Sequence, residues 1–298
     1  MTSAGPPSAT PRLAIVTVSF GSGSVLSGFL ESVATASSRP VQTIVVDNVP
    51  DGDPVAAELA RNHNVEYLSP GTNLGYGGAV NAAVATLPDA VEWILVSNPD
   101  VSLTPLSIDA LLDVGDADPS IGSLGPSILT AEGDVYPSAR AIPSLRTGVG
   151  HALFANLWTT NPWTRSYRND LADHAKQRDA GWLSGACVLV RRSAFTELGG
   201  FDDGFFMYFE DVDLGFRLGR AGYRNVYQPT AVVVHTGAHS TNTDSVRMIQ
   251  VHHESARRFL GKKYQGAVLW PIRVALRAGL AVRSALVVRR LGRERESH

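Results

Sequence analysis

The first hundred residues of this chain alternate short, uninterrupted apolar runs with stretches of helical periodicity. The apolar runs are rich in β-branched residues and read LAIVTVSF, QTIVVDN, VEYLS and EWILVSN. Continuous rather than alternating apolar residues are typical of strands buried on both faces. The segments between them, VLSGFLESVATA, PVAAELARN and GGAVNAAVATL, have the spacing of helices. This order predicts an α/β fold on a mostly parallel central sheet with flanking helices.

Polar residues stand where ligands bind in such sheets, beyond the carboxyl ends of the strands. The segment NLGYGGAVN also opens a predicted helix, and its glycines would let a diphosphate or a base approach the backbone amides. We therefore expect a nucleotide site formed by Ser19, Gly21, Asp47, Asn48, Asn73, Gly75, Gly78, Asn81, Asn98 and Asp100.

Some of these segments also have simpler interpretations. Glycines at a helix start are compatible with no more than a flexible terminus, and Asn-Pro-Asp is common in ordinary turns. The segment FGSGSVL is similar to a dinucleotide-binding turn, with Asp47 in the place of a ribose-binding acid, but Leu26 stands where the third glycine is needed. A dinucleotide-dependent oxidoreductase is therefore an alternative from a different class of enzyme.

The segment FFMYFEDVDLGFRLGRAG places Glu210, Asp211 and Asp213 directly behind an apolar, aromatic run. Acidic side chains in the first turn of a helix interact favourably with its positive end, so one interpretation is purely structural. Carboxylates so close together repel one another, however, and such clusters often mark functional sites. We treat these three residues as candidate catalytic carboxylates at a helix start.

Composition excludes several other classes. The net charge of −2 gives no reason to expect nucleic acid as a partner. The single cysteine, Cys187, excludes an intramolecular disulfide, and its apolar neighbours in GACVLV indicate a buried thiol rather than a nucleophile. The segment MTSAGPPSATP predicts a disordered arm over 1–11 without a signal-peptide pattern, and no apolar stretch is long enough to predict a membrane span.

Six segments occur in a fixed order between about residue 12 and residue 240: VTVSFGS, VVDN, NLGYGGAVN, SNPD, WLSGACVLVRRSAFTELGGFDDGFFMYFEDVDLGFRLGRAGY and VVVHTGAHS. In this combination the chain resembles the inverting glycosyltransferases of family 2, and in particular their rhamnosyltransferase branch. The resemblance implies the GT-A nucleotide-diphospho-sugar transferase fold over 12–260, with a nucleotide-binding half over about 12–130 and an acceptor half over about 131–260.

The resemblance also implies roles for the donor-side residues. Asp47 would accept a hydrogen bond from the ring N–H of the donor's pyrimidine, and Asp100 would bind the Mg²⁺ or Mn²⁺ that bridges the donor diphosphate. His235, at the end of AVVVH, matches a histidine that completes the metal shell, although a strand-end histidine is often structural. Asn98 replaces the first acid of the family's usual Asp-X-Asp motif, so we expect modest metal affinity until the donor binds.

Transfer with inversion requires a base near the acceptor hydroxyl. In the family pattern the second acid of the pair is this base, which assigns Asp211, with Glu210 as the fallback and Asp213 in support. Apolar neighbours would raise the pKa of a carboxylate and exclude water. Trp182, Ser184 and Gly185 in WLSGAC resemble the acceptor side of the family. Trp182 would stack on a sugar ring, and aromatic packing in the core is the alternative interpretation of this residue.

The resemblance further implies transfer of L-rhamnose from dTDP-rhamnose to a polyprenyl-diphosphate-linked N-acetylglucosamine, as in the synthesis of an arabinogalactan linkage unit of the cell wall. A different donor sugar, or an inactive donor-binding homologue, is an alternative. Residues 261–298 combine apolar residues with many arginines. They predict an amphipathic helix on the inner face of the cell membrane, and hence a cytoplasmic, peripherally attached enzyme. A packing or homodimer helix is the alternative for this extension.

Overall fold

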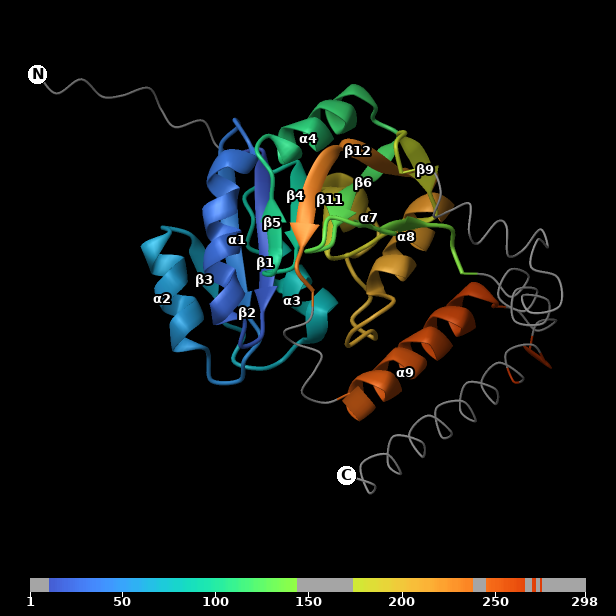
Figure 1. Cartoon of the computed structure of the whole chain (residues 1–298). Helices are drawn as coiled ribbons and strands as arrows, with labels where there is room; N and C mark the ends of the chain where they lie inside the picture. Colours follow the sequence, from blue (N-terminus) through green and yellow to red (C-terminus); the bar gives the residue numbers. More distant parts are fainter. Residues whose placement is uncertain (1–10, 144–173, 238–244, 266–269, 272–273, 275–298) are drawn as a thin grey trace, which may run out of the picture.

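The computed structural model describes residues 11–143, 174–237 and 245–265, together with 270, 271 and 274. Its centre is one large sheet (Figure 1). Along this sheet the strands follow the order β3 (Glu66–Leu68), β2 (Val41–Asp47), β1 (Leu13–Ser19), β4 (Trp93–Ser97), β11 (Cys187–Arg191), β6 (Ile121–Leu129), β12 (Arg224–His235) and β5 (Val101–Leu103). Short strands β7 (Val135–Tyr136) and β9 (Arg178–Ala180) join β6 and β12, and β8 (Ala139–Arg140) pairs with β10 (Trp182–Leu183) in a separate sheet.

The predicted parallel half is confirmed. β1 pairs in parallel with β2 and β4, and β2 pairs in parallel with β3. Beyond β4 the sheet is mixed, because β11 is inserted antiparallel between β4 and β6. β12 then runs parallel to β6 and antiparallel to β5. The periodicity of the sequence did not reveal the insertion of β11. This insertion brings late segments of the chain to the edge of the sheet where the early strands end.

Helices cover both faces of the sheet (Figure 1). Side chains of α1 (Gly23–Ala36), α2 (Pro54–Asn62) and α4 (Ser107–Ala117) pack into one core, and those of α3 (Gly75–Val84), α7 (Arg192–Glu197) and α8 (Glu210–Arg220) pack into the other. Along β1, Ile15 belongs to the first core and Val16 to the second. Cys187 is buried in the first core, and burial raises the pKa of its thiol to about 12. The expected buried thiol is therefore confirmed.

A small third core joins α8 to the last helix, α9 (Ser245–Lys263), which lies beside α8 in Figure 1. Its buried members are Phe205, Val212 and Phe259. α9 continues through residue 260, where we expected the catalytic domain to end. Most of the arm predicted over 1–11 and of the extension predicted over 261–298 lies outside the described residues. No helix within the described ranges combines the length and the apolar character needed to cross a bilayer.

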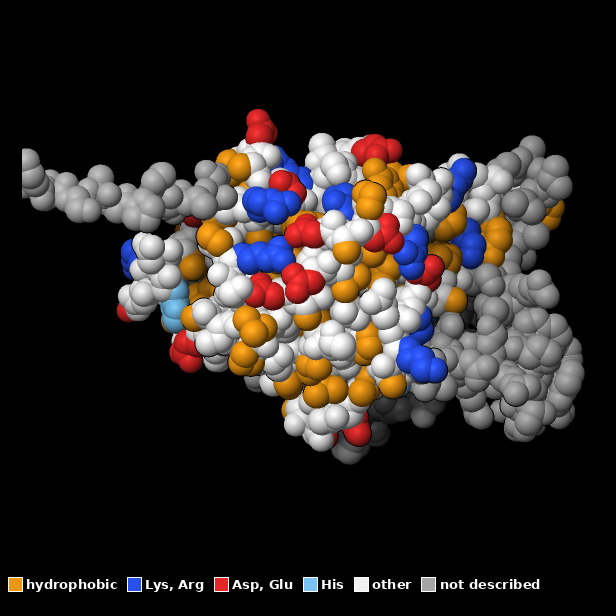
Figure 2. All heavy atoms as spheres, turned by 90° about the horizontal axis from the view of Figure 1, so that it is seen from above, with side chains coloured by type: hydrophobic (Ala, Val, Ile, Leu, Met, Phe, Trp, Pro, Cys, Tyr) orange, Lys and Arg blue, Asp and Glu red, His pale blue; other side chains and the backbone are white. Residues whose placement is uncertain are grey.

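The face of the molecule over α4 carries interspersed acidic and basic side chains (Figure 2). Charged side chains of α4 and of the segment that follows it are paired: Arg39 bonds to Asp116 and Arg224 bonds to Asp118, at 2.8 and 2.7 Å. Such local neutralisation does not favour binding of a nucleic acid, which selects clustered positive charge.

Candidate active site

The donor-side residues gather at the carboxyl ends of β1 and β2. Ser19 lies opposite Asp47 in the parallel register, and the backbone N–H of Asn48 donates to the Ser19 carbonyl at 2.8 Å. All three residues are buried. The side-chain amide of Asn48 donates to the Gly75 carbonyl at 2.9 Å, which ties this edge directly to the start of α3. Gly21 has a φ of 64°, so the turn between β1 and α1 uses the left-handed backbone that glycine allows.

Asp47 is fully buried and directs its carboxylate into the turn that follows β2. One oxygen accepts from the N–H of Val49 at 3.0 Å, and the other accepts from the N–H of Asp53 and from the Tyr67 phenol, the latter at 2.6 Å. The turn contains Gly52 at a φ of 84°. Contact between Asp47 and a pyrimidine would require this turn to open, so in the present geometry Asp47 shapes the turn.

The start of α3 is covered by the loop that precedes α8. The Asn73 side chain accepts the Gly75 N–H at 2.9 Å, in the turn just before α3. The next amide, that of Tyr76, donates to the Phe206 carbonyl at 3.0 Å. Gly75 has a φ of 73°, and a β-carbon on it would overlap that same carbonyl. One amide that we expected to be available for a diphosphate is therefore occupied by the loop.

Asn81 and Gly78, also predicted on the donor side, lie against the loop between α7 and α8. The Asn81 amide donates to the Phe201 carbonyl at 2.9 Å and to Asp203 at 2.8 Å, and its oxygen accepts the Phe201 N–H at 2.9 Å. A β-carbon on Gly78 would lie 4.0 Å from the Asp203 carboxylate. In this structure both ends of the Asn81 amide hold the loop.

Asn98, Asp100 and His235 meet because β12 pairs antiparallel with β5, which places His235 opposite Val101. The imidazole Nε2 lies 3.0 Å from Asp100 Oδ1 and 3.5 Å from Asn98 Nδ2. The Asp100 and His235 side chains are 13% and 22% exposed, so both are partly accessible. A carboxylate and an imidazole are suitable ligands for a divalent ion whose shell is completed by phosphate oxygens and water.

No group of three His, Cys, Asp or Glu side chains in the described part of the chain could hold a metal by itself. Asp100 and His235 supply only two such ligands, together with the neighbouring Asn98 amide. An ion at this position would therefore depend on oxygens of the donor diphosphate for the rest of its shell.

Glu210 and Asp211 begin α8, as the sequence predicted. The two oxygens of Asp211 accept the backbone N–H groups of Gly185 at 3.0 Å and Val212 at 2.8 Å. Burial, followed by the negative charge of Asp211, raises the pKa of Glu210 to about 8. Burial also raises the pKa of Asp211 in spite of its two N–H donors. The environment therefore favours a carboxylate that can accept a proton near neutral pH.

The loop around Gly185 connects the carboxylates to the Asp100 cluster. While the Gly185 N–H bonds to Asp211, the carbonyl of the next residue, Ala186, accepts the N–H of Asn98 at 2.9 Å. The phenol of Tyr76 donates to the Gly185 carbonyl at 2.7 Å. Burial raises the pKa of this phenol well above its usual value, so it stays a neutral donor. Sequence reasoning quoted the segment NLGYGGAVN but missed its tyrosine.

Of the remaining acceptor-side residues, Ser184 lies in the same loop and Trp182 packs beside it. The Ser184 N–H donates to the Ser138 carbonyl at 2.7 Å. The indole of Trp182 donates to the Ala141 carbonyl at 3.2 Å. The Cα and Cβ atoms of Trp182 lie so close to Gly215 of α8 that a β-carbon on this glycine would overlap them. These contacts describe packing, and stacking of Trp182 on a sugar stays a prediction.

Asp213 faces away from this loop and toward α9. Its side chain is fully buried between two cations, with Arg217 Nε and Lys262 Nζ each 2.6 Å from one of its oxygens. This third acid therefore belongs to the contact between α8 and α9. Sequence reasoning assigned Lys262 to the basic extension and missed its connection to the acidic cluster.

Comparison with known proteins gives concordant matches. The family described as glycosyltransferase like family 2 matches residues 11–252. The N-acetylglucosaminyl-diphospho-decaprenol L-rhamnosyltransferase of Mycobacterium tuberculosis is 47% identical over 290 residues, which cover 94% of each chain. Rhamnosyltransferase WbbL of Escherichia coli is 27% identical over 84% of this chain and 92% of that protein. The mannosyltransferase PcManGT from Pyrobaculum calidifontis, solved with GDP-mannose and Mn²⁺, has a TM-score of 0.60 at 15% identity, covering 96% of this chain and 74% of that one.

Proposed function

The chain belongs to the glycosyltransferase family 2, and we propose that it transfers L-rhamnose from dTDP-rhamnose to a polyprenyl-diphosphate-linked N-acetylglucosamine. The relative that is 47% identical along almost its whole length is named as an L-rhamnosyltransferase acting on N-acetylglucosaminyl-diphospho-decaprenol, and it supports the proposed sugar and acceptor. Because the chain belongs to this family, the alternative of a dinucleotide-dependent oxidoreductase, based on the segment FGSGSVL, no longer applies. The structure also disfavours a dinucleotide site, because Leu26 of α1 stands where the dinucleotide-binding turn needs its third glycine, and its side chain is completely buried.

The observation that carries the chemistry is the position of Asp211 beside the 184–186 loop, whose other side contacts Asn98. In transfer with inversion, the acceptor hydroxyl oxygen bonds to the anomeric carbon while the bond from that carbon to the diphosphate breaks. Asp211 accepts the hydroxyl proton in this step. Glu210, whose pKa is raised to about 8, stays largely protonated at neutral pH, and we assign the negative charge of the pair to Asp211 because its two oxygens accept backbone N–H groups.

The donor diphosphate is assigned to the edge of the sheet at Asn98, Asp100 and His235. Asp100 and His235 would hold a divalent ion there, and the fit rests on their 3.0 Å separation and partial exposure. When bound, such an ion neutralises the charge that develops on the departing diphosphate. The acceptor sugar is assigned to the side of the 184–186 loop, since this loop contacts both Asp211 and Asn98.

We assign the enzyme to the cytoplasmic face of the membrane, through the segment that follows α9. Lys262 and Lys263 end α9, and further along the chain Trp270 and Val274 are 58% and 51% exposed. Exposed apolar residues beside a basic segment are typical of helices that lie on an anionic bilayer. A polyprenyl-linked acceptor is held in such a bilayer, which makes this attachment useful for catalysis.

The direct test combines transfer and binding measurements on the full chain. Nucleotide-diphosphate sugars are screened for thermal stabilisation with and without Mn²⁺ or Mg²⁺, because a ligand that binds the folded state raises the melting temperature by mass action. We expect dTDP-rhamnose to give the largest metal-dependent shift, and mass spectrometry to detect one rhamnose added to the lipid-linked N-acetylglucosamine. Stabilisation and transfer with another sugar instead of rhamnose would overturn the donor assignment.

A further inference from the structure

We propose that Lys262 of α9 positions Asp211 by anchoring the segment 202–213 on which the carboxylates stand. The inference rests on the proposed function in taking Asp211 as the base. Sequence reasoning treated the residues after 260 as a membrane extension, so nothing in the motif pattern assigns Lys262 a role in the transfer step.

Lys262 links two acids on either side of the carboxylate pair. Its Nζ lies 2.6 Å from Asp202 Oδ2, before the loop, and 2.6 Å from Asp213 Oδ1, in the first turn of α8. Arg258, one turn earlier on α9, donates to the other oxygen of Asp202 at 2.7 Å. These cations hold the pKa of Asp202 well below its usual range, so the anchor is charged throughout the neutral range.

The loop between these anchors has a backbone that needs external support. Tyr208 and Phe209 have consecutive φ values of 67° and 68°, in the left-handed region that non-glycine residues rarely occupy. Both side chains pack against His252 of α9, with ring centroids 5.4 Å apart in each case. Such conformations persist only where surrounding contacts determine them, and they cluster at functional sites.

Two further contacts fix the same loop from α9. The Ser255 hydroxyl donates to the Met207 carbonyl at 2.8 Å, and Phe259 packs on Phe209 with centroids 5.8 Å apart. The loop in turn supplies the Phe206 carbonyl that bonds to Tyr76 of α3. α9 therefore holds the loop from one side, and α3 holds it from the donor side.

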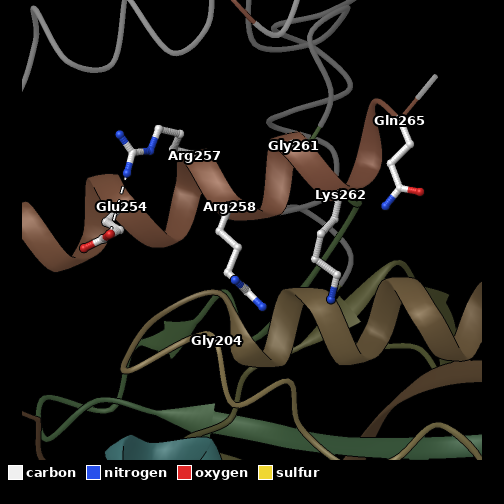
Figure 3. Close-up of a pocket in the computed structure, with 7 residues that line it drawn as sticks. All are labelled: Gly204, Glu254, Arg257, Arg258, Gly261, Lys262 and Gln265. Atoms are coloured by element: carbon white, nitrogen blue, oxygen red, sulfur yellow. Dashed lines mark ion pairs between the residues drawn. The ribbon is translucent and has the colours of Figure 1, made fainter. Parts of the chain in front are cut away.

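Figure 3 shows how the charged residues of α9 divide between two directions. Arg258 and Lys262 point toward the Gly204 loop and α8, whereas Arg257 points away and pairs with Glu254 at 3.6 Å. A β-carbon on Gly204 would overlap the Arg258 guanidinium, so the glycine makes room for this contact. The hollow of about 360 Å³ at this position is lined by cations that already have carboxylate partners, which favours a structural joint over an anion site.

Removing Lys262 would leave the buried Asp213 with Arg217 as its remaining cation. Asp213 would then have to shift or take up a proton, because an underpaired buried charge is unfavourable. Either change moves the first turn of α8, and a displacement of about 1 Å at a reacting group can reduce turnover about 100-fold. Donor binding at Asp100 should be spared.

The test compares Lys262→Met with Arg257→Met, which removes the same kind of charge from the outward face of the same helix. We expect kcat to fall about 10- to 100-fold in Lys262→Met, with donor Kd within about twofold of wild type and the acid limb of the kcat profile displaced along the pH axis. Lys262→Arg should recover part of the loss, and Arg257→Met should match wild type. Wild-type kcat and pH profile in Lys262→Met would overturn the inference.

Amide hydrogen exchange provides a readout that does not depend on the assigned reaction. Exchange in residues 203–212 should be faster in Lys262→Met than in Arg257→Met, and equal protection in the two variants would overturn the anchoring role. If Lys262→Met does not fold, Ser255→Ala replaces it, with faster exchange around Met207 and a smaller loss of kcat expected, and unchanged exchange there counting against the proposal. A wild-type enzyme that transfers no rhamnose would contradict the proposed function alone.

Discussion

Glu210 and Asp211 are neighbours at the start of α8, yet their carboxyl groups differ in hydrogen bonding. Both oxygens of Asp211 accept backbone N–H groups, whereas Oε2 of Glu210 is buried without a hydrogen-bond partner. Burial raises the pKa of both carboxyl groups, and at Asp211 two backbone N–H donors oppose this by favouring the charged form. The two acids are therefore separable by experiment, although they are adjacent in the sequence.

Asp211→Asn should abolish the base while preserving the architecture. Asparagine keeps the size and an oxygen for the Gly185 N–H, but it cannot take the acceptor's proton, so we expect turnover to fall about 10²- to 10⁴-fold. Donor affinity should barely change, and the melting temperature should change little, because asparagine serves a helix start about as well as aspartate. Steady-state kinetics and calorimetry on one preparation measure all three. Near-normal turnover would move the base to Glu210.

Glu210→Gln should change how stability depends on pH. Its folded pKa of about 8 lies above the ordinary value of 4.5, so the folded state binds more protons than the unfolded state between these values. Stability contributed by the protonated form is therefore lost as pH rises through this window. We expect the wild-type melting temperature to fall more steeply than that of Glu210→Gln between about pH 5 and pH 8.5.

The matched control is Glu58→Gln, an exposed position on α2 far from the carboxylate pair. It should reproduce the wild-type slope of melting temperature against pH. Parallel slopes for wild type and Glu210→Gln would show that Glu210 does not titrate in this window, and would contradict its assignment as the protonated partner of Asp211.

Asp100→Ala should weaken donor binding mainly when metal is present. Asp100 supplies the carboxylate of a cluster whose other partners are an imidazole and an amide, so its loss removes the negatively charged ligand. Titration calorimetry with dTDP in Mn²⁺ and in chelator measures both states. Asp113→Asn, on the exposed surface of α4, is the control and should bind like wild type. Equal weakening with and without metal would argue against coordination by Asp100.

A chain that ends at Tyr264 tests membrane attachment. Basic residues near an anionic bilayer contribute about 1 kcal/mol each, so the truncated chain should sediment poorly with anionic vesicles and lose more activity on a lipid-linked acceptor than on a short soluble one. Binding by the full chain should weaken as salt increases. If vesicle recovery is unchanged but the molar mass in solution halves, the extension is instead a homodimer contact.

The parallel half of the fold could be predicted because its strands are buried on both faces, and such strands read as continuous apolar runs. Helix α8 could be predicted as well, because its acidic first turn and its apolar face are patterns of residues close together in the sequence. The position of β11 between β4 and β6 has no comparable signal, since pairing between strands far apart in the sequence depends on tertiary packing. The resemblance to a family, rather than periodicity, connected His235 with Asp100.

The sequence indicated which residue types form the candidate site, but it did not indicate which partners each side chain contacts. Asp213 and Asp211 look equivalent in the segment EDVD, yet one faces Lys262 and the other faces Gly185. Two residues apart on a helix, their side chains point to opposite faces, and the sequence does not reveal what lies on each face. Asp47 accepts hydrogen bonds from the turn after β2 and from Tyr67 of β3, contacts that its sequence position did not indicate, and its contact with a pyrimidine stays a prediction.

The close approach of Gly75 to the Phe206 carbonyl also has a meaning for the comparison of sequences. Any side chain at position 75 would need both a left-handed backbone and a displaced carbonyl at position 206. In a homologue that carries another residue at position 75, we therefore expect the segment before the catalytic acids to follow a different path. The identity of this one residue becomes a marker, readable without a structure, of whether a related chain shares this arrangement of donor edge and base.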